Sequence, residues 1–294
     1  MAWSNGWPAM RHEFCVKVGP AAFRIGSDWA QPLNQMRRLY AGYPTPEIAD
    51  FTVRLEATSS LRRFIRPSVA INGDYMLPDA APLPLSQGLL AAEMGMNLQM
   101  ALGWRRHLIL HASAVEKDGK ALIMTGASGS GKSTLSAMLG NKGWRFLGDE
   151  FVLLDLASGD AVPYPRMISL KNEAIGAMQA TALDATFGPL MCGTPKGDIR
   201  HMVPPASAVA AMDTPAKPAL LLFPRFGFEP AIRHVQSEET FMRLTQASTN
   251  YVALGEAGFS ALTRFIRDVP ARAIDYNSGF EAGELVDRLW AELV

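Results

Sequence analysis

The chain of 294 residues is long enough for one large domain or two ordinary ones. Hydrophobic residues make up 48% of it and charged residues 19%, which is typical of a folded globular protein and excludes a disordered one. Lys plus Arg and Asp plus Glu each number 28, so the net charge is zero. There is therefore no global electrostatic reason to expect nucleic acid or an anionic membrane as a partner.

Three further features concern the compartment. The two cysteines, Cys15 and Cys192, are far apart and lack ligand-like spacing, which disfavours a disulfide framework or a zinc site. Residues 1–6 lack the basic start and apolar core of a signal peptide. No stretch approaches the ~18 uninterrupted apolar residues of a membrane span. We therefore expect a cytoplasmic protein with no membrane span.

Residues 1–103 are expected to form a separate, smaller α/β module. Residues 14–18 and 51–55 alternate apolar and polar side chains, as half-buried strands do. Residues 28–40 carry apolar side chains at helical spacing, and residues 86–102 predict a long apolar helix of the core. Nothing in this module indicates chemistry, so its expected role is structural.

The second part, residues 104–294, contains the segment GASGSGKS from Gly126 to Ser133. The apolar run at 121–124 predicts a buried strand before it, and residues 134–139 predict a helix after it. A strand, a glycine loop and a helix N-terminus together direct several backbone N–H groups toward one anion. This context indicates a phosphate-binding P-loop; the alternative is a chance match in a flexible Ser/Gly turn.

The P-loop pattern predicts a nucleoside triphosphate and Mg²⁺ as ligands, and we expect the nucleotide to be ATP. Lys132 is expected to reach the β- and γ-phosphates, and the hydroxyl of Ser133 to hold Mg²⁺. The glycines allow the backbone to approach the phosphates without a Cβ clash. The residues expected to bind the nucleotide are Gly126, Ala127, Ser128, Gly129, Ser130, Gly131, Lys132, Ser133 and Thr134.

An acidic pair follows the P-loop helix. Residues 144–147 predict a short strand that ends just before Asp149 and Glu150, and residues 151–155 predict another apolar strand. In the phosphoryl-transfer template one carboxylate contacts Mg²⁺ and the other faces the attacking hydroxyl. The alternative is an ordinary acidic turn.

These segments, with the strand predicted at 108–115, carry a family resemblance. The segments LHASAV (110–115), GASGSGKS (126–133) and GDEFV (148–152) resemble the catalytic domain of HPr kinase/phosphorylase, and most closely the HprK-related kinases of the A type. That domain is similar in its core to phosphoenolpyruvate carboxykinase. The resemblance covers roughly residues 105–155. It implies an α/β fold with a P-loop kinase domain of this type at 104–294.

The resemblance also implies catalytic roles. Asp149 matches the base that accepts the proton of a serine hydroxyl. Glu150 stands where the family has a second aspartate, and with Ser133 it would hold the metal. His111 matches a histidine close to the phosphates or the acidic pair, although a histidine at a strand end can also be a satisfied core residue.

A basic segment at 193–205 is the next candidate. It carries Lys196, Arg200 and His201 between glycines and prolines, and HprK-related proteins often have a similar loop here. In that role Arg200 stabilises charge on the transferring phosphoryl group, and Lys196 is the weaker candidate. The alternative is a solvated turn with scattered charges.

The C-terminal region is expected to complete the fold. Residues 219–224 predict a buried strand and residues 232–235 and 270–276 two further strands, whereas residues 238–246, 258–267 and 281–293 predict helices. Arg225 follows the first of these strands, where a surface ion pair or an approach to the nucleotide would both suit it.

Together these features predict an ATP-dependent kinase that transfers the γ-phosphoryl group to a hydroxyl, with a serine of a protein or peptide as the acceptor. A small-molecule kinase, a nucleotide-binding scaffold without transfer activity and a regulatory NTPase stay open as alternatives. The family's glycine-rich signature for the reverse reaction is not recognisable, so neither that reaction nor HPr as substrate is implied. The resemblance is compatible with a homo-oligomer.

Overall fold

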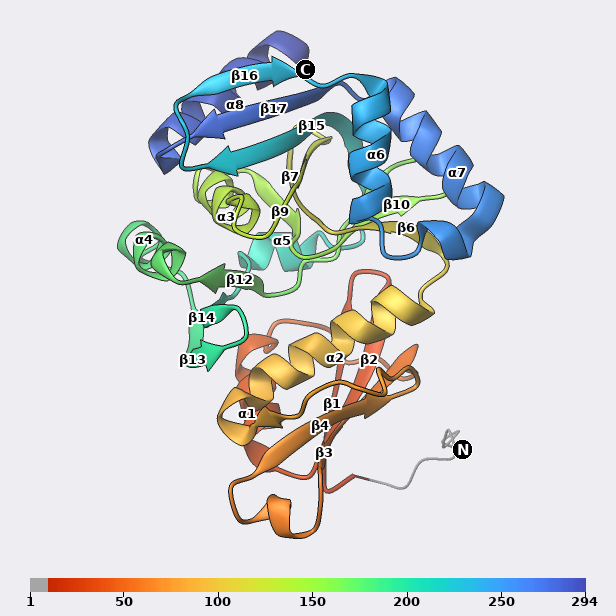
Figure 1. Ribbon diagram of the computed structural model, residues 1–294, viewed down its shortest axis with the longest axis vertical. Helices are drawn as coiled ribbons and strands as arrows, with labels where there is room; N and C mark the ends of the chain where they lie inside the picture. Colours follow the sequence, from red (N-terminus) through yellow and green to blue (C-terminus); the bar gives the residue numbers. More distant parts are fainter. Residues whose placement is uncertain (1–9) are drawn as a thin grey trace. The chain divides into compact units, whose positions relative to one another are not determined.

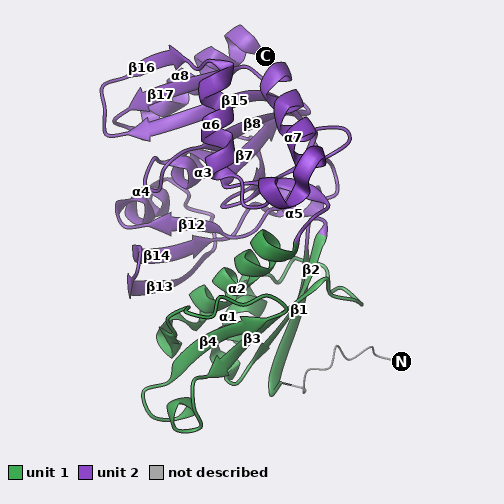
Figure 2. Cartoon of the chain, turned by 45° about the vertical axis from the view of Figure 1, so that its right-hand side comes forward, with its two compact units in different colours: residues 1–17, 21–103 green, residues 18–20, 104–294 purple. Residues whose placement is uncertain are grey.

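The computed structural model describes residues 10–294, so residues 1–6, from which we expect no signal peptide, lie outside the described part. The chain divides into two compact units (Figure 2): unit 1 is Met1–Lys17 with Ala21–Gly103, and unit 2 is Val18–Pro20 with Trp104–Val294. Within residues 10–294 no helix has the length and apolar character that crossing a membrane requires.

Unit 1 is built on a five-stranded sheet in the order β1-β2-β3-β4-β5. β2 and β3 are parallel, whereas β3–β4 and β4–β5 are antiparallel. The apolar helix α2 packs against β3 and β4, and α1 packs against α2 and β2. The elements are β1 (His12–Val18), β2 (Ala21–Ser27), α1 (Ala30–Leu39), β3 (Phe51–Ala57), η1 (Leu61–Arg63), β4 (Ser68–Gly73), β5 (Leu83–Pro84), η2 (Leu85–Gln87) and α2 (Gly88–Gly103).

The strands and helices predicted for unit 1 are present, and the sequence prediction missed β2, β4 and the two-residue strand β5. In β2 almost every residue is buried, so the alternation that marks a half-buried strand is absent. This strand lies inside its sheet, between β1 and β3, and α1 packs against it.

Unit 2 is built on a six-stranded sheet in the order β16-β17-β15-β8-β7-β9. β8, β15 and β17 run parallel, so the segments that follow them emerge at the same edge of the sheet. β7 is antiparallel to both β8 and β9, which makes β9 run in the same direction as β8. The strands are β7 (Ala112–Lys117), β8 (Lys120–Thr125), β9 (Arg145–Gly148), β15 (Lys217–Phe226), β16 (Ala231–His234) and β17 (Ala271–Tyr276).

Helices cover both faces of this sheet (Figure 1). Leu122 and Met124 of β8 belong to a core shared with α3 and α8, whereas Ala121 and Ile123 belong to a core shared with α6 and α7. Successive side chains of a strand point to opposite faces, which explains why the run at 121–124 is apolar throughout. The helices of unit 2 are α3 (Lys132–Asn141), α4 (Glu173–Thr181), α5 (Ala206–Ala210), α6 (Ser237–Ala247), α7 (Tyr251–Asp268) and α8 (Gly279–Leu293).

Two three-stranded sheets complete unit 2, in the orders β11-β10-β6 and β12-β14-β13. Their strands are β6 (His107–Leu110), β10 (Val152–Asp155), β11 (Ala161–Val162), β12 (Ile168–Lys171), β13 (Phe187–Thr194) and β14 (Gly197–Met202).

The structure corrects the sequence prediction at two places in unit 2. The strand predicted at 108–115 is two strands of different sheets, β6 and β7, because the chain breaks at His111. The loop predicted at 193–205 is in large part the antiparallel hairpin of β13 and β14, with Pro195 and Lys196 at its turn.

Candidate active site

The segment predicted to be a P-loop leads from the end of β8 into the start of α3, as the sequence predicts. It emerges at the sheet edge where the parallel strands β15 and β17 also end, which is where open α/β sheets bind their ligands. Residues 126–129 are exposed, Ser130 is buried, and Ser133 and Thr134 are half-buried in the first turn of α3. The hydroxyl of Tyr276, at the end of β17, donates a hydrogen bond of 3.1 Å to the Ser130 carbonyl.

Two glycines make the shape of this loop possible. Gly129 and Gly131 have φ angles of +83° and +94°, which side-chain-bearing residues rarely adopt. A Cβ on Gly131 would also lie 2.1 Å from the Tyr276 hydroxyl oxygen, whereas a Cβ on Gly129 would meet nothing within 4 Å. The loop is therefore held close to Tyr276 at Gly131 and is open at Gly129.

Lys132 turns back onto its own loop. Its Nζ donates hydrogen bonds to the carbonyl oxygens of Gly126 and Ala127, at 2.8 and 3.0 Å. Only 8% of Lys132 is exposed. Burial lowers its pKa, and the negative charges of Asp149 and Glu150 oppose that effect. This cation is therefore held inside the loop, within reach of a phosphate group bound there.

The hydroxyl of Ser130 provides an independent test of whether the loop fits phosphate. Its Oγ is buried and makes no hydrogen bond to any atom of residues 10–294. A buried polar atom without a partner is costly, which suggests that its partner is a ligand. An anion at the α3 N-terminus would accept hydrogen bonds from this hydroxyl and from the N–H groups of the first helical turn. The residues present fit a phosphate group.

Asp149 lies directly behind Ser133. The carboxylate accepts hydrogen bonds from the Ser133 hydroxyl at 3.0 Å, from the Ser169 backbone N–H at 3.2 Å, and from the Ser113 hydroxyl. Only 2% of Asp149 is exposed. Burial raises its pKa, the negative charge of Glu150 adds to this rise, and the three hydrogen bonds oppose it.

Glu150 faces a different set of partners. His111 Nε2 lies 3.3 Å from one of its carboxylate oxygens, and Lys171 Nζ lies 3.4 Å from the other. Burial alone would raise the pKa of Glu150, but the hydrogen bond from His111 and the charge of Lys171 hold it well below its ordinary value. Its backbone has φ of +65°, which is uncommon outside glycine and is found at functional sites.

The structure brings most of the predicted site residues together. Ser133, Asp149, Glu150 and His111 form one connected cluster beside Lys132. Arg200 makes its contacts elsewhere: its Nε donates to the Gly188 carbonyl at 2.8 Å, and its guanidinium lies 5.4 Å from the Phe187 ring centroid. Both partners lie at or next to the start of β13. The basic side chains that act electrostatically on Lys132 and Glu150 are Lys171 and Lys196.

The cluster also suits a divalent cation, provided that a nucleotide supplies the remaining ligands. No group of three or more His, Cys, Asp or Glu side chains that could hold a metal occurs in the described residues. Mg²⁺ is commonly bound by one or two carboxylates, a hydroxyl, water and substrate phosphates rather than by an all-protein cage. Ser133 can offer a lone pair to such an ion while its O–H continues to donate its hydrogen bond to Asp149.

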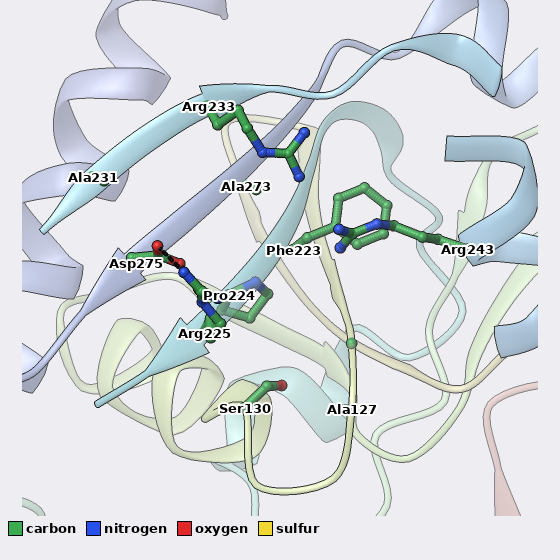
Figure 3. A pocket seen from close by; sticks show the side chains of 11 residues that line it. Ala127, Ser130, Phe223, Pro224, Arg225, Ala231, Arg233, Arg243, Ala273 and Asp275 are labelled. Carbon is green, nitrogen blue, oxygen red and sulfur yellow. Dashed lines mark hydrogen bonds and ion pairs between the residues drawn. The ribbon is translucent and has the colours of Figure 1, made fainter. Parts of the chain in front are cut away.

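A cavity of about 420 Å³ adjoins the P-loop. It runs from Gly126, Ala127 and Ser130 to β15, β16, β17 and α6 (Figure 3). Arg243 lies across the ring of Phe223, 4.7 Å from its centroid, and Arg225 donates a hydrogen bond of 2.9 Å to Asp275. The ion pair considered for Arg225 is thus present, and the same side chain lines the cavity.

Three residues that the sequence did not single out belong to this site: Ser113, Lys171 and Tyr276. Ser113 lies within the LHASAV segment, so its position next to the P-loop strand was a usable signal. Lys171 and Tyr276 reach the site from β12 and β17, distant in sequence, and no local pattern marks them.

Comparison with known proteins adds little to this description. No family model matches the chain, and no curated protein matches it. Among solved structures it is similar to the Hpr(Ser) kinase/phosphatase from Coxiella burnetii, with 14% sequence identity and a TM-score of 0.28. That alignment covers 63% of this chain and 98% of the other.

Proposed function

We propose that unit 2 is an ATP- and Mg²⁺-dependent kinase that transfers the γ-phosphoryl group to a hydroxyl. The observation that carries this proposal is the direct hydrogen bond from Ser133 to Asp149 beside the buried cation Lys132. A phosphate loop, an acidic pair and a buried lysine in one place are the parts that phosphoryl transfer requires.

The loop and the cavity next to it suit the two ends of a nucleotide. Phosphates on the loop would accept hydrogen bonds from the N–H groups of the α3 N-terminus and from the Ser130 hydroxyl. Lys132 would exchange its two carbonyl partners for phosphate oxygens. The nucleoside would extend into the cavity, where the stacked pair Phe223 and Arg243 offers a flat face to a base.

The two carboxylates suit different tasks. Glu150, held ionised by His111 and Lys171, would hold Mg²⁺ together with Ser133, and the ion would neutralise charge on the phosphates. Asp149, whose pKa is raised, would accept the proton. The acceptor oxygen forms a bond to the γ-phosphorus, the bond from that phosphorus to the β-phosphate oxygen breaks, ADP leaves, and the hydroxyl proton goes to Asp149.

Lys171 is the proposed cation facing the transferring group, in place of Arg200. Lys171 lies 3.4 Å from Glu150, whereas the contacts of Arg200 are with Phe187 and Gly188. A fixed positive charge near the γ-phosphate stabilises the charge that develops during transfer.

For the acceptor we propose a serine of a protein or peptide, which is the class that the resemblance to HPr kinases implies. The test is incubation of the purified protein with γ-labelled ATP and Mg²⁺, with and without a lysate of its own organism. Label in a discrete protein or peptide band, absent with Asp149→Asn, is the expected result. Label only in inorganic phosphate would indicate an NTPase, label in a metabolite a small-molecule kinase, and no turnover a nucleotide-binding scaffold.

A further inference from the structure

The connection between β3 and β4 in unit 1, residues 58–67, exposes three large apolar side chains at one place. Leu61, Phe64 and Ile65 are 63%, 75% and 58% exposed, and we call these three residues the apolar tip. Figure 1 shows this connection, in orange, at one end of the β3–β4 pair. A cluster of exposed apolar side chains at one place typically marks an interaction site, whereas single ones need no explanation.

The backbone of this connection is fixed to unit 1. Trp29 Nε1 donates a hydrogen bond of 2.9 Å to the Arg63 carbonyl, and the Arg63 guanidinium donates to the Asp28 carbonyl and lies 3.3 Å from the Asp28 carboxylate. Within the turn, the Ile65 N–H donates to the Leu61 carbonyl at 2.9 Å. These hydrogen bonds fix the turn, and the turn holds the apolar tip in its exposed position.

The charged residues of the connection itself are all arginines. Between Glu56 and Asp74 the chain has three arginines and no acidic residue, although the whole protein has zero net charge. Arg63 is paired with Asp28. Arg62 and Arg66 are exposed, and no ion pair joins either of them to another residue in the range 10–294.

We propose that this connection is a membrane-docking loop that inserts its apolar tip into the surface of an anionic lipid bilayer. Exposed Phe and Leu beside Arg is the combination that interfacial membrane anchors use, with the rings at the acyl boundary and the guanidinium groups at lipid phosphates. The neutral charge of the whole chain does not oppose this, because attraction to a charged surface acts within about 10 Å and is therefore local.

A lipid surface suits this site better than a protein partner does. The three apolar side chains stand out from a turn, whereas recognition of a peptide needs a groove that receives side chains. A bilayer interface accepts a projecting apolar group of any shape, and its anionic headgroups are the complement of two unpaired arginines.

The test is co-sedimentation of the full chain with phosphatidylcholine vesicles, with and without phosphatidylserine, at two salt concentrations. The intact protein is expected to bind vesicles that contain phosphatidylserine and to be released by salt. Phe64→Ser should weaken binding about tenfold. Arg62→Gln and Arg66→Gln should each weaken it about fivefold and reduce its salt dependence.

Two variants of the same unit are matched controls. Ile48→Ser removes another exposed apolar side chain, 83% exposed and distant in sequence, and Arg38→Gln removes an exposed cation of α1. Both should bind vesicles as the unaltered protein does. Because all the substituted side chains are exposed, thermal unfolding should be unchanged in every variant.

Three results would overturn this proposal. One is no vesicle binding by the intact protein. Another is binding that Phe64→Ser leaves unchanged. The third is capture of a protein or acidic peptide that depends on Phe64 while vesicles are ignored, which would assign the apolar tip to a protein partner. None of these results depends on nucleotide binding by unit 2.

Discussion

The hydroxyl of Ser133 donates a hydrogen bond of 3.0 Å to the carboxylate of Asp149, joining the first turn of the P-loop helix to the acidic pair that follows β9. Ser133 is the residue that the P-loop pattern assigns to Mg²⁺, and Asp149 is buried behind it. This contact makes the proposed phosphate site and the proposed proton acceptor one structural unit.

The first prediction separates the two carboxylates. Asp149→Asn should keep Mg²⁺-dependent ATP binding and lower phosphoryl transfer by about a hundredfold or more, because the proton acceptor is lost. Glu150→Gln should instead weaken binding in the presence of Mg²⁺ and leave binding without it nearly unchanged. Calorimetric titration with and without Mg²⁺, together with label transfer, measures both. The opposite pattern would exchange the roles of Asp149 and Glu150.

The second prediction concerns stability and pH. Because burial raises the pKa of Asp149 in the folded state, the native protein binds a proton more tightly there than the unfolded chain does. The free energy of unfolding should therefore fall as pH rises from the ordinary aspartate range through the raised pKa. Asp149→Asn removes this effect, and the Ser113 and Ser133 hydroxyls can rotate to accept from the new amide.

We therefore expect Asp149→Asn to be more stable than the unaltered protein at neutral pH, with a difference that shrinks in acid. Urea unfolding without Mg²⁺ or nucleotide at several pH values measures it. A variant that is less stable at neutral pH would show that the hydrogen bonds to the carboxylate outweigh the cost of burying its charge.

The third prediction compares two loop glycines. Gly129→Ala and Gly131→Ala place a side chain at similar φ angles of +83° and +94°, each at a cost of about 1–2 kcal/mol. Only the Cβ at Gly131 meets an atom, the Tyr276 hydroxyl oxygen at 2.1 Å. The free energy of unfolding of Gly131→Ala should therefore fall by at least about 1 kcal/mol more than that of Gly129→Ala.

Adding Tyr276→Phe removes the clashing oxygen and should restore part of the loss in Gly131→Ala, while giving nothing to Gly129→Ala. Thermal unfolding of the four variants, followed by ATP titration, provides the comparison. Equal destabilisation by the two alanines would mean that the loop moves away from Tyr276 at little cost.

The fourth prediction ranks the basic side chains. Lys171→Met should lower phosphoryl transfer by about a hundredfold, as loss of a donor to a developing charge does in other enzymes. Arg200→Met should act mainly on the β13–β14 hairpin, because its contacts are with Phe187 and Gly188. Transfer rates and thermal unfolding of both variants decide between them. If Arg200→Met reduced transfer more, the hairpin would have to rearrange in the complex with nucleotide.

The parts of this site that the sequence predicted are those encoded locally. The P-loop residues are contiguous, and an apolar run and a helix surround them, so their positions follow from one short segment. Asp149 and Glu150 were found because they directly follow β9. The same holds for the core, since the run at 121–124 is apolar because both faces of β8 are covered.

What the sequence could not predict depends on pairing between distant segments. Lys171 contacts Glu150 because β12 lies beside the site. Tyr276 reaches the loop because β17 pairs in parallel with β15, and β15 pairs in parallel with β8. The break at His111 has no glycine or proline to mark it. β13 shows no regular alternation of buried and exposed residues, so its hairpin with β14 was expected to be a loop.

The most direct test of the nucleotide site is calorimetric titration of the protein with a non-hydrolysable ATP analogue in the presence of Mg²⁺, beside Lys132→Ala and Lys142→Ala. Lys142 caps the far end of α3 and its side chain is 46% exposed, so its loss should leave binding unchanged. We predict saturable binding that Lys132→Ala abolishes. Equal binding by all three proteins, or none by the unaltered one, would contradict the assignment of residues 126–134 as the phosphate site.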